Sequence, residues 1–200
     1  DFIGTTDNQD IVFKRNNALA GRISDRVTTF GNLAGGNNNT GQSNVAIGDR
    51  AMMTNTSGLA NTAVGANALR INTTGNYNTT VGNTAQDRNT TGQRNTALGN
   101  AAMFYNESGD QNTAVGGSAL WGSKTGKENV AVGYQTHYYN NIGNYNTSVG
   151  AQALMWSTQG SYNTALGYRA GLLDSTLALD YTTTIGANAK VFRSRSIVLG

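Results

Sequence analysis

The stretch NTAVGANALRINTTGNY, residues 61–77, is followed at once by NTTVGNTAQDRNTTGQR, residues 78–94, and the two share nine of their seventeen residues. Three columns of residues keep this spacing along most of the chain. Two are glycine columns, at Gly31, Gly48, Gly65, Gly82, Gly99, Gly116, Gly133, Gly150 and Gly167, and at Gly41, Gly58, Gly75, Gly92, Gly109, Gly126, Gly143 and Gly160. The third is Asn44, Asn61, Asn78, Asn95, Asn112, Asn129, Asn146 and Asn163. Columns held in phase in this way are the signature of a solenoid.

A coil of seventeen residues is too short for the helical repeat types, and phrases such as NTAVG are rich in β-branched residues. Two short strands joined by two tight turns fit such a coil. Both glycine columns then mark turns that need a positive φ, and a buried asparagine at a corner bonds the amides of its own turn and stacks on the next coil. The sequence predicts an all-β chain, a parallel β-roll or β-solenoid with 17-residue coils over residues 27–171, its rungs about 4.8 Å apart.

Two neighbouring columns of each predicted strand are apolar. In the first predicted strand, a column of small residues is followed directly by a column of larger apolar residues. The small residues are Ala46, Ala63, Thr80, Ala97, Ala114, Ala131, Ser148 and Ala165. The larger ones are Ile47, Val64, Val81, Leu98, Val115, Val132, Val149 and Leu166. In the second predicted strand, an alanine column is followed in most repeats by a larger apolar residue. The alanines are Ala51, Ala68, Ala85, Ala102, Ala119 and Ala153, and the larger residues are Met52, Leu69, Met103, Leu120 and Leu154. Adjacent strand residues point to opposite faces, so both faces are apolar although a thin coil has one interior.

The second apolar face therefore predicts self-association. Burial within one coil, at about 25 cal/mol per Å², barely matches the conformational entropy lost by ordering it, so contact between chains supplies the missing stability. On this interpretation an aspartate in place of Val115 is a buried, unpaired carboxylate that prevents folding or association.

Two segments depart from the period. Residues 1–26 predict an N-terminal cap of short strands around a turn at residues 7–10. Residues 172–200 predict a collar, with a widened turn from Leu172 to Tyr181, and then shorter rungs, because the glycine step becomes nineteen at Gly186 and fourteen at Gly200. The repeat pattern is still present at Gly200, so we expect it to continue beyond that residue.

Composition narrows the functional classes. Only 12% of residues are charged, the net charge is +3, and the charges are interspersed, so no basic stripe for nucleic acid is predicted. No apolar run reaches the roughly 18 residues of a membrane-spanning helix, and no membrane insertion is predicted. Cysteine is absent and His137 is the single histidine, which predicts a structural histidine and no metal site, catalytic residue or cofactor. We interpret Lys190, Arg193 and Arg195 as a charged turn face rather than an anion site.

Several phrases carry a resemblance to a known family. SNVAIG (residues 43–48), NVAVG (129–133) and above all TTTIGANAKVFRSRSIVLG (182–200) resemble the head repeats of YadA-type trimeric autotransporter adhesins. The regular 17-residue form looks more like the repeats of surface proteins and phage tail fibres of Bacteroidetes. The resemblance implies a left-handed homotrimer in an extracellular setting, at a bacterial surface or in a phage or injection-machine fibre. It implies no single function, because such heads serve adhesins and fibres alike.

Large aromatic residues gather in successive repeats. Two neighbouring columns contain Phe104, Trp121 and Tyr138, and Tyr105, Tyr139 and Trp156; a turn column contains Tyr145 and Tyr162. Other repeats place Arg70, Asp87 or Arg88 there, which predicts positions that are at least partly exposed. Stacked exposed rings suit sugar rings, a protein receptor or an apolar surface. These eight aromatic residues are the candidate ligand contacts, with packing between protomers as the alternative.

The sequence thus favours a non-enzymatic structural and adhesive segment of a trimeric fibre, attached to a host cell or a polymer. An ice-binding solenoid is one alternative, although the column after the asparagines is mixed: Val45, Thr62, Thr79, Thr96, Thr113, Val130, Thr147 and Thr164. A polysaccharide-degrading β-helix is the other, and it requires paired carboxylates or a basic group in a cleft.

Overall fold

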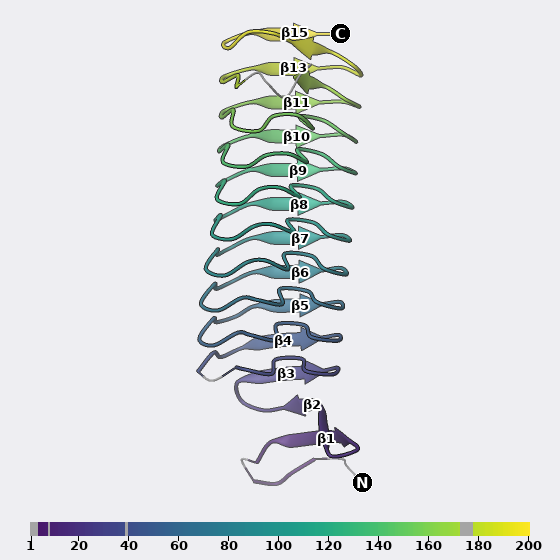
Figure 1. The fold of residues 1–200 in the computed structure, drawn as a ribbon, viewed down its shortest axis with the longest axis vertical. Helices are drawn as coiled ribbons and strands as arrows, with labels where there is room; N and C mark the ends of the chain where they lie inside the picture. The colour runs from purple at the N-terminus through teal and green to yellow at the C-terminus, as the bar shows by residue number, and fades with distance from the viewer. Residues whose placement is uncertain (1–3, 8, 39, 173–177) are drawn as a thin grey trace.

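The computed structural model describes residues 4–7, 9–38, 40–172 and 178–200. The chain forms a rod in which successive rungs stack along the long axis, with the two termini at opposite ends (Figure 1). The strands are β1 (Ile11–Arg15), β2 (Ala18–Ile23), β3 (Val27–Phe30), β4 (Asn44–Ile47), β5 (Thr62–Val64), β6 (Thr79–Val81), β7 (Thr96–Leu98), β8 (Thr113–Val115), β9 (Val130–Val132), β10 (Thr147–Val149), β11 (Thr164–Leu166), β12 (Gly171–Leu172), β13 (Thr183–Ile185), β14 (Lys190–Val191) and β15 (Ile197–Leu199).

One sheet of 13 strands runs the length of the rod, and a second sheet pairs β12 with β14. From β3 onward the strands of the long sheet are parallel, and equivalent residues of successive repeats face each other, as Ala97 faces Ala114. The step of nineteen places Thr164 against Thr183, and the step of fourteen places Thr183 against Ile197. The predicted all-β parallel solenoid with 17-residue coils is confirmed.

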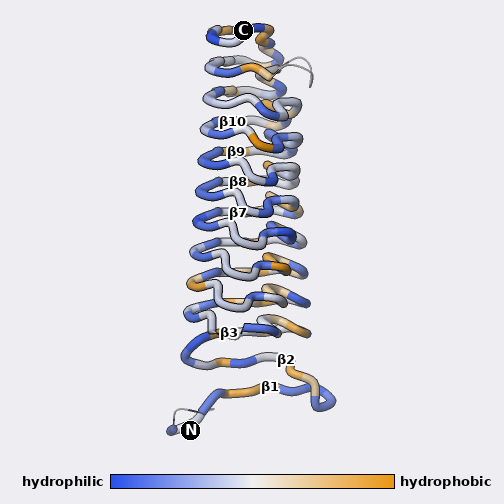
Figure 2. Tube along the Cα trace, turned by 60° about the vertical axis from the view of Figure 1, so that its left-hand side comes forward, coloured by the Kyte–Doolittle hydropathy of each residue, from blue (hydrophilic) through white to orange (hydrophobic). Residues whose placement is uncertain are grey.

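The small column of the strands fills the interior. Ala97, Ala114 and Ala131 are 0% exposed, whereas the residues on either side of each alanine point outward and are partly exposed. The column of Val115 is therefore outside the coil, and the expectation of a buried carboxylate there is wrong for the single chain. Figure 2 shows hydrophilic and hydrophobic segments recurring from rung to rung.

Each coil between β4 and β11 contains one strand, so the expectation of two was wrong. The segment predicted as the second strand is a turn in which Met103, Leu120 and Leu154 have φ between 46° and 50°. Because this left-handed residue interrupts the alternation of an extended chain, both Ala102 and Met103 point inward. The interior consequently contains the alanine of the strand and a consecutive pair from this turn.

The two glycine columns have different causes. Gly99 has φ 136°, and a Cβ there would lie 2.6 Å from the carbonyl oxygen of Gly116 in the next coil. Gly92 has no positive φ, so the reason expected for its column was wrong. A Cβ at Gly92 would instead collide with Oδ1 of Asn89 and lie 2.5 Å from the carbonyl oxygen of Gly109. The second column is glycine because successive backbones approach closely.

The asparagine column forms a ladder between coils rather than within one turn. Oδ1 of Asn95 accepts hydrogen bonds from the backbone N–H of Asn112 (2.9 Å) and from its Nδ2 (3.2 Å). Nδ2 of Asn112 also donates to the carbonyl oxygen of Gly126 at 2.7 Å. A second ladder, not predicted from the sequence, runs through Asn38, Asn55, Asn72, Asn89 and Asn106 and is buried from Asn55 onward. Both ladders satisfy buried polar groups by joining one rung to the next.

The second ladder is interrupted at Ser123. Oδ1 of Asn106 and Oγ of Ser123 are both buried without a hydrogen-bond partner. The variant Ser123→Asn is expected to restore the ladder and to raise the free energy of unfolding by about 1–2 kcal/mol, measured by urea denaturation. Ser57→Asn, at an exposed position, is the control and should change little. A stability of Ser123→Asn equal to or below that of the parent would contradict this account.

The ends of the rod differ from its middle. β1 and β2 form an antiparallel hairpin whose turn is Asn16–Asn17, with φ of 48° and 60°, and β2 pairs with β3. This turn lies nearer the repeat than the one predicted at residues 7–10, of which residue 8 is outside the described residues. Most of the widened turn predicted after Leu172, residues 173–177, also lies outside them.

Candidate ligand-binding surface

The rod has two outward faces. The alanines of the strands and the alanine–leucine or alanine–methionine pairs of the turns belong to the same buried clusters, so the interior lies between them. Outward side chains of the strands form the strand face. The positions that follow the buried pairs form the return face: residues 53–54, 70–71, 87–88, 104–105, 121–122, 138–139 and 155–156.

Six of the eight candidate residues come together on the return face, and we call them the aromatic patch: Phe104, Tyr105, Trp121, Tyr138, Tyr139 and Trp156. Within one column, Trp121 stacks on Tyr138 with ring centroids 4.8 Å apart and an angle of 1° between the planes. In the next column, Tyr139 stacks on Trp156 at 4.9 Å and 13°. Tyr105 meets Trp121 edge-on at 4.6 Å. The repeat spacing produces the stacks, because equivalent positions lie one rung apart.

A hollow of about 450 Å³ opens within the aromatic patch. Its lining residues are Tyr105, Trp121, Gly122, Lys124, Tyr139 and Asn141. Gly122 stands in its column between Tyr105 and Tyr139 and has no side chain to fill the space between them. Trp121 and the two tyrosines supply ring surface, and Lys124 and Asn141 supply hydrogen-bond donors. This combination of flat apolar surface and a few polar groups is suited to a sugar ring.

The charges beside the aromatic patch are largely paired. Asp87 is buried and accepts two hydrogen bonds from Arg70, from Nε at 2.7 Å and from Nη2 at 3.0 Å. This pairing raises the pKa of Arg70. The sequence-based expectation of exposure was therefore wrong for Asp87. Arg88 lies with its Cζ 5.8 Å from the ring centres of both Phe104 and Tyr105, which extends the aromatic patch with a cation.

The other two candidates belong to a separate stack. Tyr145 and Tyr162 are exposed and stack at 4.9 Å, and Tyr162 stacks on Tyr181 at 4.8 Å. Among the described residues, no ring contact joins this stack to the aromatic patch. Tyr181 was not predicted to belong to this stack, because the nineteen-residue step moves it out of the regular column. Its column could have been found by realigning on Gly186.

The chain matches no protein-family model, no curated protein and no solved structure.

His137 lies inside the coil rather than in a site. It is fully buried, neither ring nitrogen has a hydrogen-bond partner, and burial lowers its pKa to about 3. Across the described ranges, no group of three or more histidine, aspartate or glutamate side chains is placed to hold a metal ion. In the same ranges, no helix has the length and apolar character needed to cross a membrane.

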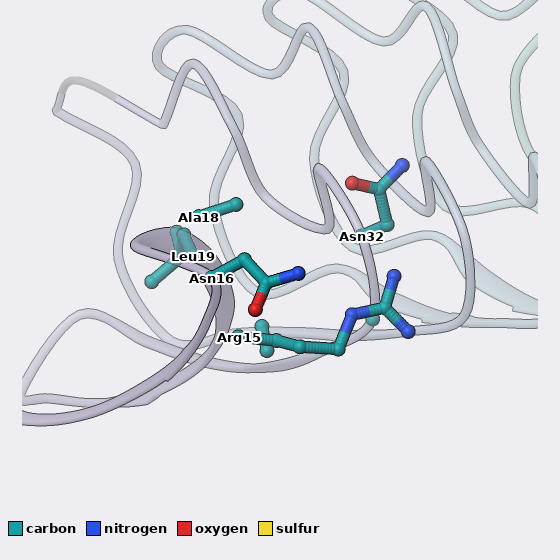
Figure 3. Close-up of a pocket in the computed structure, with 7 residues that line it drawn as sticks. Arg15, Asn16, Ala18, Leu19 and Asn32 are labelled. Carbon is teal, nitrogen blue, oxygen red and sulfur yellow. The ribbon is translucent and has the colours of Figure 1, made fainter.

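A further hollow, of about 350 Å³, lies between the N-terminal hairpin and the first coil (Figure 3). Arg15 and Asn16 of the hairpin and Asn32 of the coil border it, together with Ala18 and Leu19. It has no aromatic residue in its lining, and Arg15 is its single charged residue. The lack of ring surface in its lining distinguishes it from the aromatic patch.

Proposed function

We propose that this chain is a structural and adhesive segment of an extracellular fibre, at a bacterial surface or in a phage or injection-machine fibre. In this proposal three copies associate as left-handed β-rolls, and the aromatic patch attaches the fibre to a carbohydrate-bearing surface.

The outward apolar column of the strand face supports self-association most directly. Ile47, Val81, Val149, Leu166 and Ile185 are 37–41% exposed in the single chain and lie in one line along the sheet. Monomeric proteins rarely expose a continuous apolar strip of this length. Covering it with further copies of the same chain removes it from water at about 25 cal/mol per Å² and adds the burial that a thin coil lacks.

The number of copies is supported by the resemblance of TTTIGANAKVFRSRSIVLG, residues 182–200, to trimeric adhesin heads. The other outward column of the strand face contains threonine or valine. The two outward columns of this face therefore combine Thr or Val with Val, Ile or Leu. Ice binding would favour two neighbouring threonine columns, which this sequence does not have.

The aromatic patch supports the adhesive part of the proposal. The coil does not require these rings for its interior, since other coils have Met53 or Arg70 at the same position. Rings stacked on one face present a continuous surface for sugar rings. Three copies in one fibre multiply a weak contact into useful avidity.

We expect light scattering to give three times the 21.0 kDa of one chain at micromolar concentration, and a glycan array to detect binding. Trp121→Ala should lose at least tenfold in glycan affinity while its mass and melting temperature stay close to those of the parent. A stable monomer would exclude the self-association, and a Trp121→Ala variant with lower melting but unchanged binding would assign the patch to packing between copies.

A further inference from the structure

A second hollow, of about 330 Å³, lies at the C-terminal end of the aromatic patch. Its lining residues are Gln152, Met155, Trp156, Arg169, Asn188 and Lys190. The hollow occurs where the 17-residue coils end and the turn of the regular coil gives way to the paired strands β12 and β14. In that pair Gly171 faces Lys190, so the strand beside the lysine presents no side chain at that position.

Neither of the two cations of this hollow has a carboxylate partner among the described residues. Nε of Arg169 donates to Oε1 of Gln152 at 2.7 Å, and Nζ of Lys190 donates to the backbone carbonyl oxygen of Arg169. Neither side chain takes part in an ion pair with any described aspartate or glutamate. Burial, and then the positive charge of Arg169, lower the pKa of Lys190. The partly buried ammonium of Lys190 thus lies near the like charge of the exposed Arg169, and a bound anion would offset their repulsion.

The hollow also has a ring surface that continues the aromatic patch. Trp156 contributes to its lining and stacks on Tyr139, which contributes to the larger hollow around Gly122. A ligand longer than one sugar unit can therefore lie across both hollows. Asn188 adds an amide group that suits a hydroxyl group, whereas the amide of Gln152 already bonds Arg169 and Gln135.

We propose that this hollow binds the acidic unit of a carbohydrate, a pyranose bearing a carboxylate or sulfate group. Its ring packs on Trp156, and its anionic group lies between Arg169 and Lys190. The inference rests on the proposed attachment to carbohydrate and names the class of sugar. Arginine and lysine make charge-assisted hydrogen bonds to such oxyanions, and these are stronger than the bonds available to a neutral sugar.

The site differs from the basic cluster visible in the sequence. Lys190, Arg193 and Arg195 are neighbours along the chain, but Arg193 and Arg195 are exposed and are absent from the lining of this hollow. Arg169, which precedes Lys190 by 21 residues, is the cation that shares it. The juxtaposition arises from the stacking of coils and has no signal in the local sequence.

The test uses the whole chain, isothermal titration calorimetry, and three probes: an oligogalacturonate, its fully methyl-esterified counterpart, and inorganic sulfate. We expect the oligogalacturonate to bind at least tenfold more tightly than the neutral ester. The double variant Arg169→Gln with Lys190→Gln should lose this preference, and Trp156→Ala should weaken both sugars. A control that removes the same charge elsewhere, Lys14→Gln with Arg94→Gln, should bind as the parent does.

Equal affinity for the acidic and neutral sugars, or an unchanged preference in the Arg169/Lys190 double variant, would overturn the acidic subsite while leaving attachment through the aromatic patch in place. If sulfate binds as tightly as the oligogalacturonate and Trp156→Ala changes neither affinity, the hollow is a simple anion site rather than an acidic sugar subsite. Absence of binding by every probe would also overturn the acidic subsite, and the glycan array decides separately whether the aromatic patch attaches the fibre to another carbohydrate. The mass of the assembly is measured separately and tests the proposed fibre independently of either result.

Discussion

Ala114→Asp is expected to prevent the chain from folding, whereas Val115→Asp should leave it folded and break its self-association. The two residues are adjacent in β8 and point to opposite sides of it. Ala114 is 0% exposed, in a cluster that also contains Met103 and Leu120. A carboxylate there has no partner and costs several kcal/mol, which is on the order of the whole stability of a small domain. At position 115 the carboxylate reaches solvent in the single chain.

Circular dichroism and light scattering separate the two effects. Ala114→Asp should lose the cooperative melting transition, and Ala114→Ser should retain it, since Ser148 occupies the equivalent position of β10. Val115→Asp should keep the β-sheet spectrum and lower the mass to that of one chain. Normal melting of Ala114→Asp would show that the interior has been assigned to the wrong column. An unchanged mass for Val115→Asp would show that the strand face is not the surface of association.

The period of the sequence predicts how the coils stack, but it does not determine the path within a coil. Residues seventeen apart must face each other once the coils are in register, which is why the stacked rings of Trp121 and Tyr138 were foreseeable. Met103 and Leu120 have the residue types of a strand, yet their φ values are 50° and 49°. Hydrophobic pattern does not distinguish an extended residue from a left-handed one, so the second strand was predicted where a turn occurs.

Some features were visible in the sequence and were missed, whereas others depend on the fold. The second asparagine ladder repeats at Asn55, Asn72 and Asn89 with the same spacing as the first, and a search of every column would have found it. The hollow shared by Arg169 and Lys190 could not be found in this way. It joins residues from successive coils at the place where the period changes, and only their packing brings them together.

His137 is expected to make the stability of the rod fall steeply in acid. It occupies the interior column between Leu120 and Leu154, and its imidazole is buried without a hydrogen-bond partner. Burial lowers its pKa from 6.5 to about 3, so the folded chain keeps this ring neutral over a range in which the unfolded chain protonates it. The unfolded state then binds more protons, and stability falls as the pH falls from about 6.5. The loss is about 1.4 kcal/mol per pH unit and totals roughly 4–5 kcal/mol near pH 3.

His137→Leu, which places the residue of the neighbouring coils in this column, should remove that dependence. Urea denaturation of parent and variant at a series of pH values isolates the histidine, because the difference between the two proteins cancels the other titrating groups. The variant should already be more stable at pH 8. In the parent, the buried ring nitrogens without partners destabilise the folded chain by about 1–3 kcal/mol, and the leucine removes them. The difference should widen from pH 6.5 down to pH 3 and then remain constant. A difference that stays the same across this range would mean that His137 binds its proton as readily in the folded rod as in the unfolded chain, and that its ring reaches water.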